Sequence, residues 1–217
     1  MERLRNFKEL EDDFIHALLS INTKKAEQII RELTQRESFV NIGDGLIAPA
    51  LAKTGKSWED GSTAISQVYL SAHICNKILD KLLPDKEFVM KEKPRLGIAT
   101  LGDFHSLGKK VVTYSLKAAG YNITDFGLGL LIHDIVEKCR KNKTEILLIS
   151  ALMLPSALLI KQLIEALEEG NLHIKVIVGG APFCFDRDLW REVGAYAMGY
   201  NASDAIGIVK RITKEMK

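Results

Sequence analysis

The stretch Leu96-Gly97-Ile98-Ala99-Thr100-Leu101 is apolar, and after Gly102 it runs into Asp103-Phe104-His105-Ser106-Leu107-Gly108. The first segment predicts a buried β-strand, and the residues from Lys109 onward predict a helix. In α/β proteins, ligands bind where a strand end turns into a helix start. Here that turn carries a carboxylate and an imidazole, and a carboxylate can hold one ring nitrogen of a histidine while the other nitrogen binds a metal. We therefore predict that His105 is a metal ligand and that Asp103 orients it.

The alternation of strand and helix continues to the C-terminus. Strands are expected over residues 95–101, 122–126, 146–150, 174–178 and 195–198, and helices over residues 107–119, 132–142, 156–169, 186–193 and 202–214. The third and fourth strands are apolar without alternation, as expected of central parallel strands buried on both faces. These elements predict a flavodoxin-like (Rossmann-like) α/β domain, a doubly wound five-stranded parallel sheet in the order 2-1-3-4-5.

Residues 1–83 have the periodicity of helices. Apolar residues recur at helical spacing in four segments, which cover residues 7–21, 23–33, 42–55 and 64–83. Four helices with short connections predict an N-terminal four-helix bundle that caps the second domain. Residues 84–94 are lysine-rich and bracketed by prolines, so they predict a linker, and a hinge, before the α/β domain of residues 95–217.

Composition limits the function classes. The chain of 217 residues has a formal net charge of +2, which gives no case for nucleic-acid binding. No apolar run approaches the ~18–20 residues that span a bilayer, and the N-terminus lacks the apolar region of a signal peptide. Cys75, Cys139 and Cys184 are too widely spaced for a disulfide framework, which suits a reducing compartment. We expect a cytoplasmic protein without nucleic-acid or membrane partners.

Three loops of the α/β domain are expected to meet at one edge of the sheet, because the first, third and fourth strands are neighbours in the predicted order. The loops cover residues 103–108, 150–156 and 179–182. Gly108 and the pair Gly179-Gly180 remove side chains beside the sheet, so these loops predict a channel for a flat or elongated group. Ser150 would form its floor, and Ser156 is expected as the N-cap of the following helix.

The order D-x-H-x-x-G, S-x-L and G-G in these loops resembles the motifs of cobalamin-binding domains. Residues 109–149 separate the first two motifs and residues 153–178 the last two, which is close to the spacing in that family. The text of residues 102–109 is similar to that of corrinoid methyl carriers and methionine synthase, and residues 44–47 and 55–61 resemble their helical cap. The resemblance covers nearly the whole chain.

The resemblance implies that His105 is the lower axial ligand of cobalt and displaces the dimethylbenzimidazole of the cofactor, whose tail would enter the channel. Asp103 would accept the free ring N–H of His105, and Ser156 would complete this relay. Trp58 stands where related carriers usually have phenylalanine, and it would cover the upper face of the cofactor. The implied cofactor contacts in the α/β domain are Asp103, Phe104, His105, Ser106, Leu107, Gly108, Ser150, Leu152, Met153, Gly179, Gly180 and Ala181.

The function that the resemblance implies is a methyl carrier. The cofactor, as cob(I)alamin, would take a methyl group from a donor on one partner methyltransferase, and as methylcobalamin would deliver it to a second, with a possible reductive activator as a further partner. A cobalamin sensor or storage protein is the alternative, and the small subunit of a radical mutase is a third possibility.

Simpler interpretations of single residues also stay open. Asp103 and His105 could be a helix-capping pair, Ser150 and Ser156 ordinary turn residues, and Trp58 part of the bundle core. The paired lysines Lys109 and Lys110 are expected on a solvated helix face.

Overall fold

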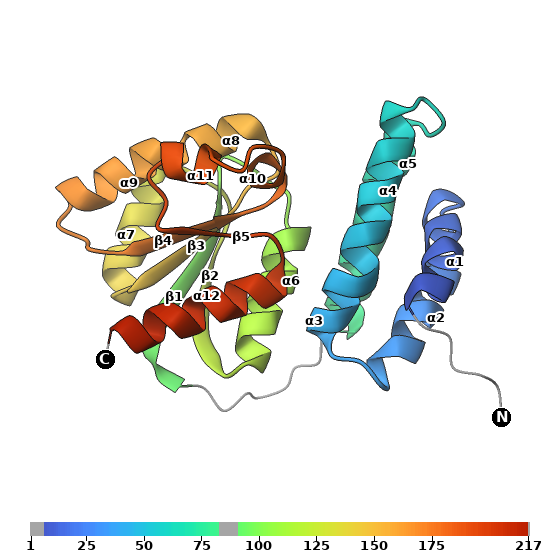
Figure 1. Cartoon of the computed structure of the whole chain (residues 1–217), viewed down its shortest axis with the longest axis horizontal. Coiled ribbons are helices and arrows are strands. Elements are labelled where there is room, and N and C mark those ends of the chain that lie inside the picture. Colours follow the sequence, from blue (N-terminus) through green and yellow to red (C-terminus); the bar gives the residue numbers. More distant parts are fainter. Residues whose placement is uncertain (1–6, 83–90, 217) are drawn as a thin grey trace. The chain divides into compact units, whose positions relative to one another are not determined.

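The structure is a computed structural model that describes residues 7–82 and 91–216. The chain divides into two compact units, Met1–Lys86 and Glu87–Lys217 (Figure 1). Most of the predicted linker, residues 84–90, lies outside the described residues, and its last four residues belong to the first strand. No helix among the described residues has the length and apolar character needed to cross a membrane.

The first unit is a bundle of helices, as predicted. Its elements are α1 (Phe7–Leu19), α2 (Thr23–Thr34), α3 (Phe39–Ile42), the π-helical turn η1 (Gly43–Ile47), α4 (Ala48–Glu59) and α5 (Ile65–Leu82). The core is formed by side chains at helical spacing, among them Phe14, Leu18 and Ile29, which are fully buried. The expected end of the third helical segment near Gly55 is wrong. Nothing crowds Gly55 and the helix continues to Glu59, where Gly61 with φ +74° follows its C-cap.

The second unit is the predicted α/β domain. Its strands are β1 (Lys91–Leu101), β2 (Tyr121–Leu130), β3 (Ile146–Ser150), β4 (Lys175–Gly179) and β5 (Ala197–Gly199). All pairings are parallel and the strand order is β2-β1-β3-β4-β5, which confirms the sequence prediction. Its helices are α6 (Leu107–Ala118), α7 (Ile132–Asn142), α8 (Leu154–Leu158), α9 (Ile160–Glu169), α10 (Ala181–Phe185), α11 (Leu189–Glu192) and α12 (Ala202–Glu215).

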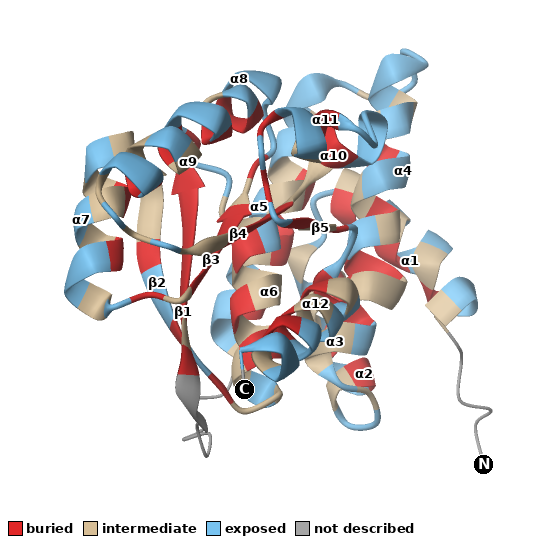
Figure 2. Ribbon diagram, turned by 60° about the vertical axis from the view of Figure 1, so that its left-hand side comes forward, coloured by how far each residue is buried: buried red, intermediate tan, exposed pale blue. Residues whose placement is uncertain are grey.

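Helices cover both faces of the sheet (Figures 1 and 2). In β3, Leu147 and Ile149 join a core cluster with α7 and α8 to α11, whereas Ile146 and Leu148 join a second cluster with α6 and α12. The strand is therefore apolar throughout because both of its faces are buried. This arrangement leaves the carboxyl ends of the strands as the edge where loops are free to form a site.

Several element boundaries differ from the sequence prediction. β2 extends through the glycine-rich residues 127–130, beyond the end of the strand predicted over 122–126. The helix predicted over 156–169 is two helices, α8 and α9. The one predicted over 186–193 is the short α11, and α10, which precedes it, was not predicted. Pro155 and Pro182 lie in the first turns of α8 and α10, where proline is tolerated because the first helical N–H groups have no intrahelical partner.

Candidate cofactor site

The predicted loops meet at the carboxyl edge of the sheet. Ala99 in β1 pairs with Ile149 in β3, and Ser150 at the end of β3 pairs with Gly179 at the end of β4. The loops that follow these strands therefore start at the same level. Three residues implied as cofactor contacts lie where these loops pass into the next helix. Ser106 immediately precedes α6, Leu107 is its first residue, and Ala181 is the first residue of α10.

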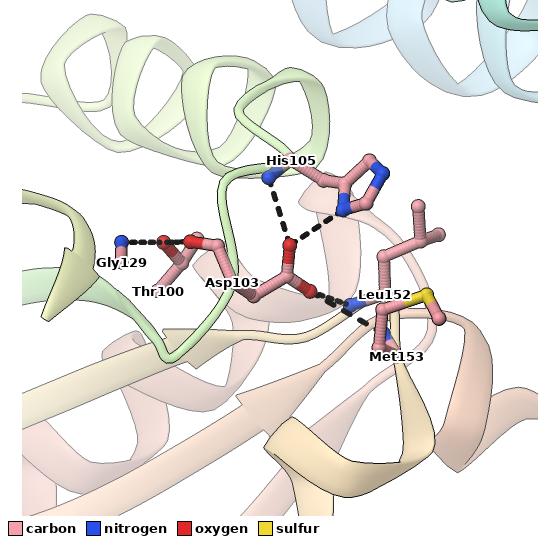
Figure 3. A network of polar contacts seen from close by, with 6 residues as sticks. All are labelled: Thr100, Asp103, His105, Gly129, Leu152 and Met153. Carbon is pink, nitrogen blue, oxygen red and sulfur yellow. Dashed lines mark hydrogen bonds and ion pairs between the residues drawn. The ribbon is translucent and has the colours of Figure 1, made fainter. Parts of the chain in front are cut away.

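The Asp103 side chain holds His105 at two points (Figure 3). Its Oδ1 accepts the backbone N–H of His105 at 2.8 Å and lies 2.5 Å from the ring Nδ1. The carboxylate side chain is 1% exposed, whereas the imidazole is 53% exposed. Because Nδ1 faces the carboxylate, Nε2 is the nitrogen that can bind a metal, and the carboxylate fixes the tautomer that this requires.

The same carboxylate joins two loops. Its Oδ2 accepts the backbone N–H groups of Leu152 and Met153, at 3.0 and 3.3 Å. Burial alone would raise the pKa of Asp103, but hydrogen bonds from the backbone of His105 and Leu152, and from the His105 ring, outweigh burial and lower it. Asp103 is therefore a carboxylate at neutral pH and can accept all of these hydrogen bonds.

Ser156 is not the helix N-cap that the sequence suggested. Helix α8 begins at Leu154 with Met153 as its N-cap, so Ser156 is a buried residue inside the helix. The hydrogen bonds of Asp103 Oδ2 run to backbone amides of this loop, at Leu152 and Met153. The relay role of Ser156 stays a prediction.

Thr100 and Gly129 fix the backbone of the Asp103 loop, and sequence reasoning missed both. The Thr100 hydroxyl, fully buried, donates to the carbonyl of Asp103 and accepts the N–H of Gly129 at 3.1 Å. The Gly129 N–H also reaches the Asp103 carbonyl at 2.7 Å (Figure 3). The available signal was Thr100, a polar residue within the otherwise apolar stretch of residues 96–101, because a buried hydroxyl needs a partner.

The glycines of the predicted channel allow close approach between loops. A Cβ at Gly108 would lie 3.2 Å from Ser150 Oγ, which places these two predicted cofactor contacts side by side. A Cβ at Gly180, where φ is +117°, would lie 1.9 Å from the carbonyl oxygen of Ala151, so this position has room only for glycine. Gly108 thus leaves space beside a hydroxyl, whereas Gly180 lets two loops pack together.

Apolar side chains surround this edge. Phe104, Leu152, Met153 and Leu154 are exposed, and the exposed Leu131 follows β2. Phe104 lies against Gly129, since a Cβ there would be 2.3 Å from the phenyl ring. Exposed large apolar side chains gathered at one edge are typical of a ligand or partner surface.

Trp58 belongs to the other unit. It lies in the last turn of α4 and is 48% exposed, so it is not a fully buried core residue. Its proposed contact with the upper face of the cofactor stays a prediction.

The fold and this edge define a cobalamin-binding protein, and comparison with protein families supports the assignment. Residues 96–209 match the model of a B12 binding domain, and residues 10–83 match a second B12 binding domain model. The chain belongs to the B12-binding family, and its cofactor is cobalamin.

Relatives and a solved structure match most of the chain. Monomethylamine corrinoid protein 1 of Methanosarcina acetivorans is 31% identical, with 95% of this chain and 98% of the relative covered. Trimethylamine corrinoid protein 1 of the same organism is 31% identical, with 75% of this chain and 77% of the relative covered. The solved structure of the Methanosarcina barkeri monomethylamine corrinoid protein has 27% identity and a TM-score of 0.83, covering 95% of this chain and 100% of that one.

The residues at the edge fit cobalamin. The half-exposed imidazole of His105 presents one nitrogen donor, and the buried carboxylate of Asp103 supports it. Gly108 beside Ser150 leaves a space that a Cβ would fill. An imidazole with a carboxylate partner is a common metal-ligand arrangement, so His105 is the residue that would bind the cobalt.

Proposed function

We propose that this protein carries methyl groups between methyltransferases, with His105 as the lower axial ligand of its cobalamin. When bound, the cofactor supplies a cobalt centre that can accept and release a methyl group. The pairing of the half-exposed His105 ring with the buried Asp103 carboxylate is the observation that carries the proposal. The relatives named as corrinoid proteins of methylamines support it.

In this proposal each residue has a defined task. Asp103 accepts the Nδ1–H of His105. This hydrogen bond favours the tautomer with its proton on Nδ1, which leaves the lone pair of Nε2 free for the metal. His105 would hold the cobalt through Nε2, and the Asp103 carboxylate would stabilise a proton held at that nitrogen whenever it is not bound to the metal. Ser150 and Gly108 would receive the displaced nucleotide tail, and Ser156 would complete the relay behind Asp103.

Partner proteins would supply donor and acceptor chemistry. Because relatives bear the names of monomethylamine and trimethylamine, methylamines are the first donors to test, each with its own methyltransferase. Trp58 would shield the upper face until a partner replaces it. A reductive activator would restore the cobalt when it is oxidised.

Methyl transfer tests the carrier function. Reduced holoprotein should accept a methyl group from methyl iodide and pass it to an acceptor methyltransferase, in repeated turnovers. A protein that binds cobalamin with His105 but never turns over would instead be a sensor or storage protein.

The His105→Ala variant tests the ligand separately. It should still fold, because this side chain is half exposed, and its bound cobalamin should have the visible spectrum of a form without a histidine ligand. His133→Ala is the matched control, since His133 is also exposed and lies next to a carboxylate, Asp134. A His105→Ala spectrum identical to that of the unmodified protein would remove His105 from the ligand role.

A further inference from the structure

A buried lysine lies four residues after His105. Lys109 was expected on a solvated helix face, but that expectation is wrong because its side chain is only 4% exposed. It stands in the first turn of α6, where the helix dipole disfavours a positive charge. A buried cation in this position needs a specific partner.

The partners of Lys109 lie on β2. Its Nζ donates to the carboxylate of Asp125 and, at 3.1 Å, to the carbonyl of Gly127. The Asp125 carboxylate also accepts the N–H of Gly127 at 2.9 Å. The Asp125 side chain is 42% exposed, so the pair buries its cation more deeply than its anion.

These contacts stabilise an irregularity in β2. Ile98 pairs with Asp125 but the next residue, Ala99, pairs with Gly127, so Phe126 is the extra residue of a β-bulge. Gly127 has φ +117°, a conformation that glycine adopts easily. Lys109 therefore ties the start of α6 to the bulge, which sets the direction of the strand beyond it.

The strand beyond the bulge holds the other end of the His105 loop. Gly129 donates to the Asp103 carbonyl at 2.7 Å, and the Leu130 carbonyl accepts the N–H of Gly102 at 2.9 Å. The loop is thus fixed to β2 before His105 through Gly102 and Asp103, and after it through Lys109.

We infer that Lys109 and Asp125 are positioning residues for His105, because their ion pair and the β-bulge hold the loop that presents the imidazole. The inference rests on the proposed role of His105 as the cobalt ligand. The hydrogen bonds of the Lys109 ammonium run to Asp125 and Gly127, so Lys109 acts on His105 through the backbone. Loss of the Lys109–Asp125 ion pair should leave the His105 imidazole in the site but orient it less well toward the metal.

The test uses the full chain loaded with cyanocobalamin. Cyanide is titrated into it, and the midpoint at which the lower ligand is displaced is measured from the visible spectrum. Lys109→Met keeps most of the side-chain volume and removes the charge. We expect a midpoint about ten-fold lower, a typical loss when support of a metal ligand is removed. Lys117→Met, at the other end of α6, is the control and should leave the midpoint unchanged.

Hydrogen exchange gives a second measurement that does not involve the cofactor. In Lys109→Met, the amides of residues 102–108 should exchange faster than in the unmodified protein. A folded Lys109→Met variant with the original cyanide midpoint and the original exchange rates would overturn the inference.

Two further variants separate the possible failures. If Lys109→Met does not fold, Asp125→Asn decides, because Asp125 is partly exposed and its loss leaves the lysine without a counter-charge. A lower midpoint in Asp125→Asn supports the inference, and an unchanged one overturns it. If His105→Ala has the original midpoint, the proposed ligand fails, and the exchange rates of Lys109→Met then decide alone whether the pair positions the loop.

Discussion

Asp103 is the residue on which the geometry of the site depends. One buried carboxylate accepts hydrogen bonds from the His105 backbone, the His105 ring, and the backbone of the loop after β3. A single side chain therefore orients the imidazole and joins the loop that carries it to the neighbouring loop. Hydrogen bonds to an ionised acceptor are stronger than those between neutral groups, which suits this double task.

Replacing Asp103 by asparagine should make stability less dependent on pH. The pKa of Asp103 is lowered in the folded protein, so its carboxylate stabilises the fold above the ordinary aspartate pKa, and this contribution is lost as the pH falls through the lowered value. At neutral pH, Asp103→Asn should reduce the free energy of unfolding by about 1–3 kcal/mol, since buried hydrogen-bond donors lose an ionised acceptor.

Urea unfolding of the cofactor-free protein at several pH values measures this difference. The gap between the unmodified protein and Asp103→Asn should shrink as the pH falls through the acid range. Glu59, which is exposed to solvent in the helical unit, gives a matched control in Glu59→Gln, and this variant should unfold like the unmodified protein at every pH. A gap that is constant from neutral to acid pH would contradict the assignment.

The contact between the two motif residues could be predicted from the sequence, whereas the burial of the lysine that follows them could not. The pairing of Asp103 with His105 follows from their spacing, since a side chain at a strand end can accept the N–H two residues later. Lys109 was misjudged because lysines usually lie in solvent, and its partner Asp125 is remote in sequence. A tertiary ion pair has no local sequence signal.

At the scale of elements, the glycine positions divide into two kinds. Gly180 permits β4 to turn against the backbone of Ala151, whereas Gly108 leaves space beside the Ser150 hydroxyl. The first kind is required by the fold and the second by the predicted cofactor channel. Substitution by alanine should distinguish them.

Gly180→Ala should destabilise the fold by about 3 kcal/mol or more, because the new Cβ meets a backbone oxygen and the positive φ is strained. Gly108→Ala should stay within about 1 kcal/mol of the unmodified protein, because the serine side chain can rotate and alanine favours helices. Its cobalamin affinity should nevertheless fall, since the methyl group fills the channel.

Thermal unfolding and equilibrium dialysis with cobalamin measure the two effects. Gly207→Ala in α12 is the control, because nothing lies near its Cβ position and neither property should fall. Unchanged cobalamin affinity in Gly108→Ala would show that the channel lies elsewhere.

The elements were more predictable than their ends. The strand order and the helical bundle follow from hydrophobic patterns that report burial on one or both faces. The extension of β2 was missed because residues 127–130 contain two glycines, which usually indicate a loop. There, two tertiary hydrogen bonds decide the conformation: Gly129 donates to the Asp103 carbonyl, and the Leu130 carbonyl accepts the N–H of Gly102.

At the scale of the whole molecule, each unit has its own core. Both hydrophobic clusters of the α/β unit are formed by residues of that unit, and the His105 loop is held by β1, β2 and the loop after β3. The structure of this site therefore depends on contacts within Glu87–Lys217.

A fragment of residues 87–217 should fold alone and retain the histidine ligand. We expect cooperative thermal unfolding and, with cobalamin, the same lower-ligand spectrum as the full chain. The fragment lacks the whole helical unit, whereas full-length Trp58→Ala lacks only one of its side chains. Comparing how easily ligands reach the upper face of the cofactor in the two proteins separates the effect of Trp58 from that of the rest of the unit. A fragment that folds but binds cobalamin without a histidine ligand would contradict this division of roles.

The most direct test of the account identifies the atom that binds cobalt. The protein is produced with histidine labelled with nitrogen-15, loaded with unlabelled cobalamin and reduced to Co(II), and its electron paramagnetic resonance spectrum is recorded. A histidine ligand gives doublet splitting from the labelled nitrogen, and we predict this doublet in the unmodified protein and its loss in His105→Ala. A triplet, from the unlabelled base of the cofactor itself, or a doublet that persists in His105→Ala, would contradict the central claim.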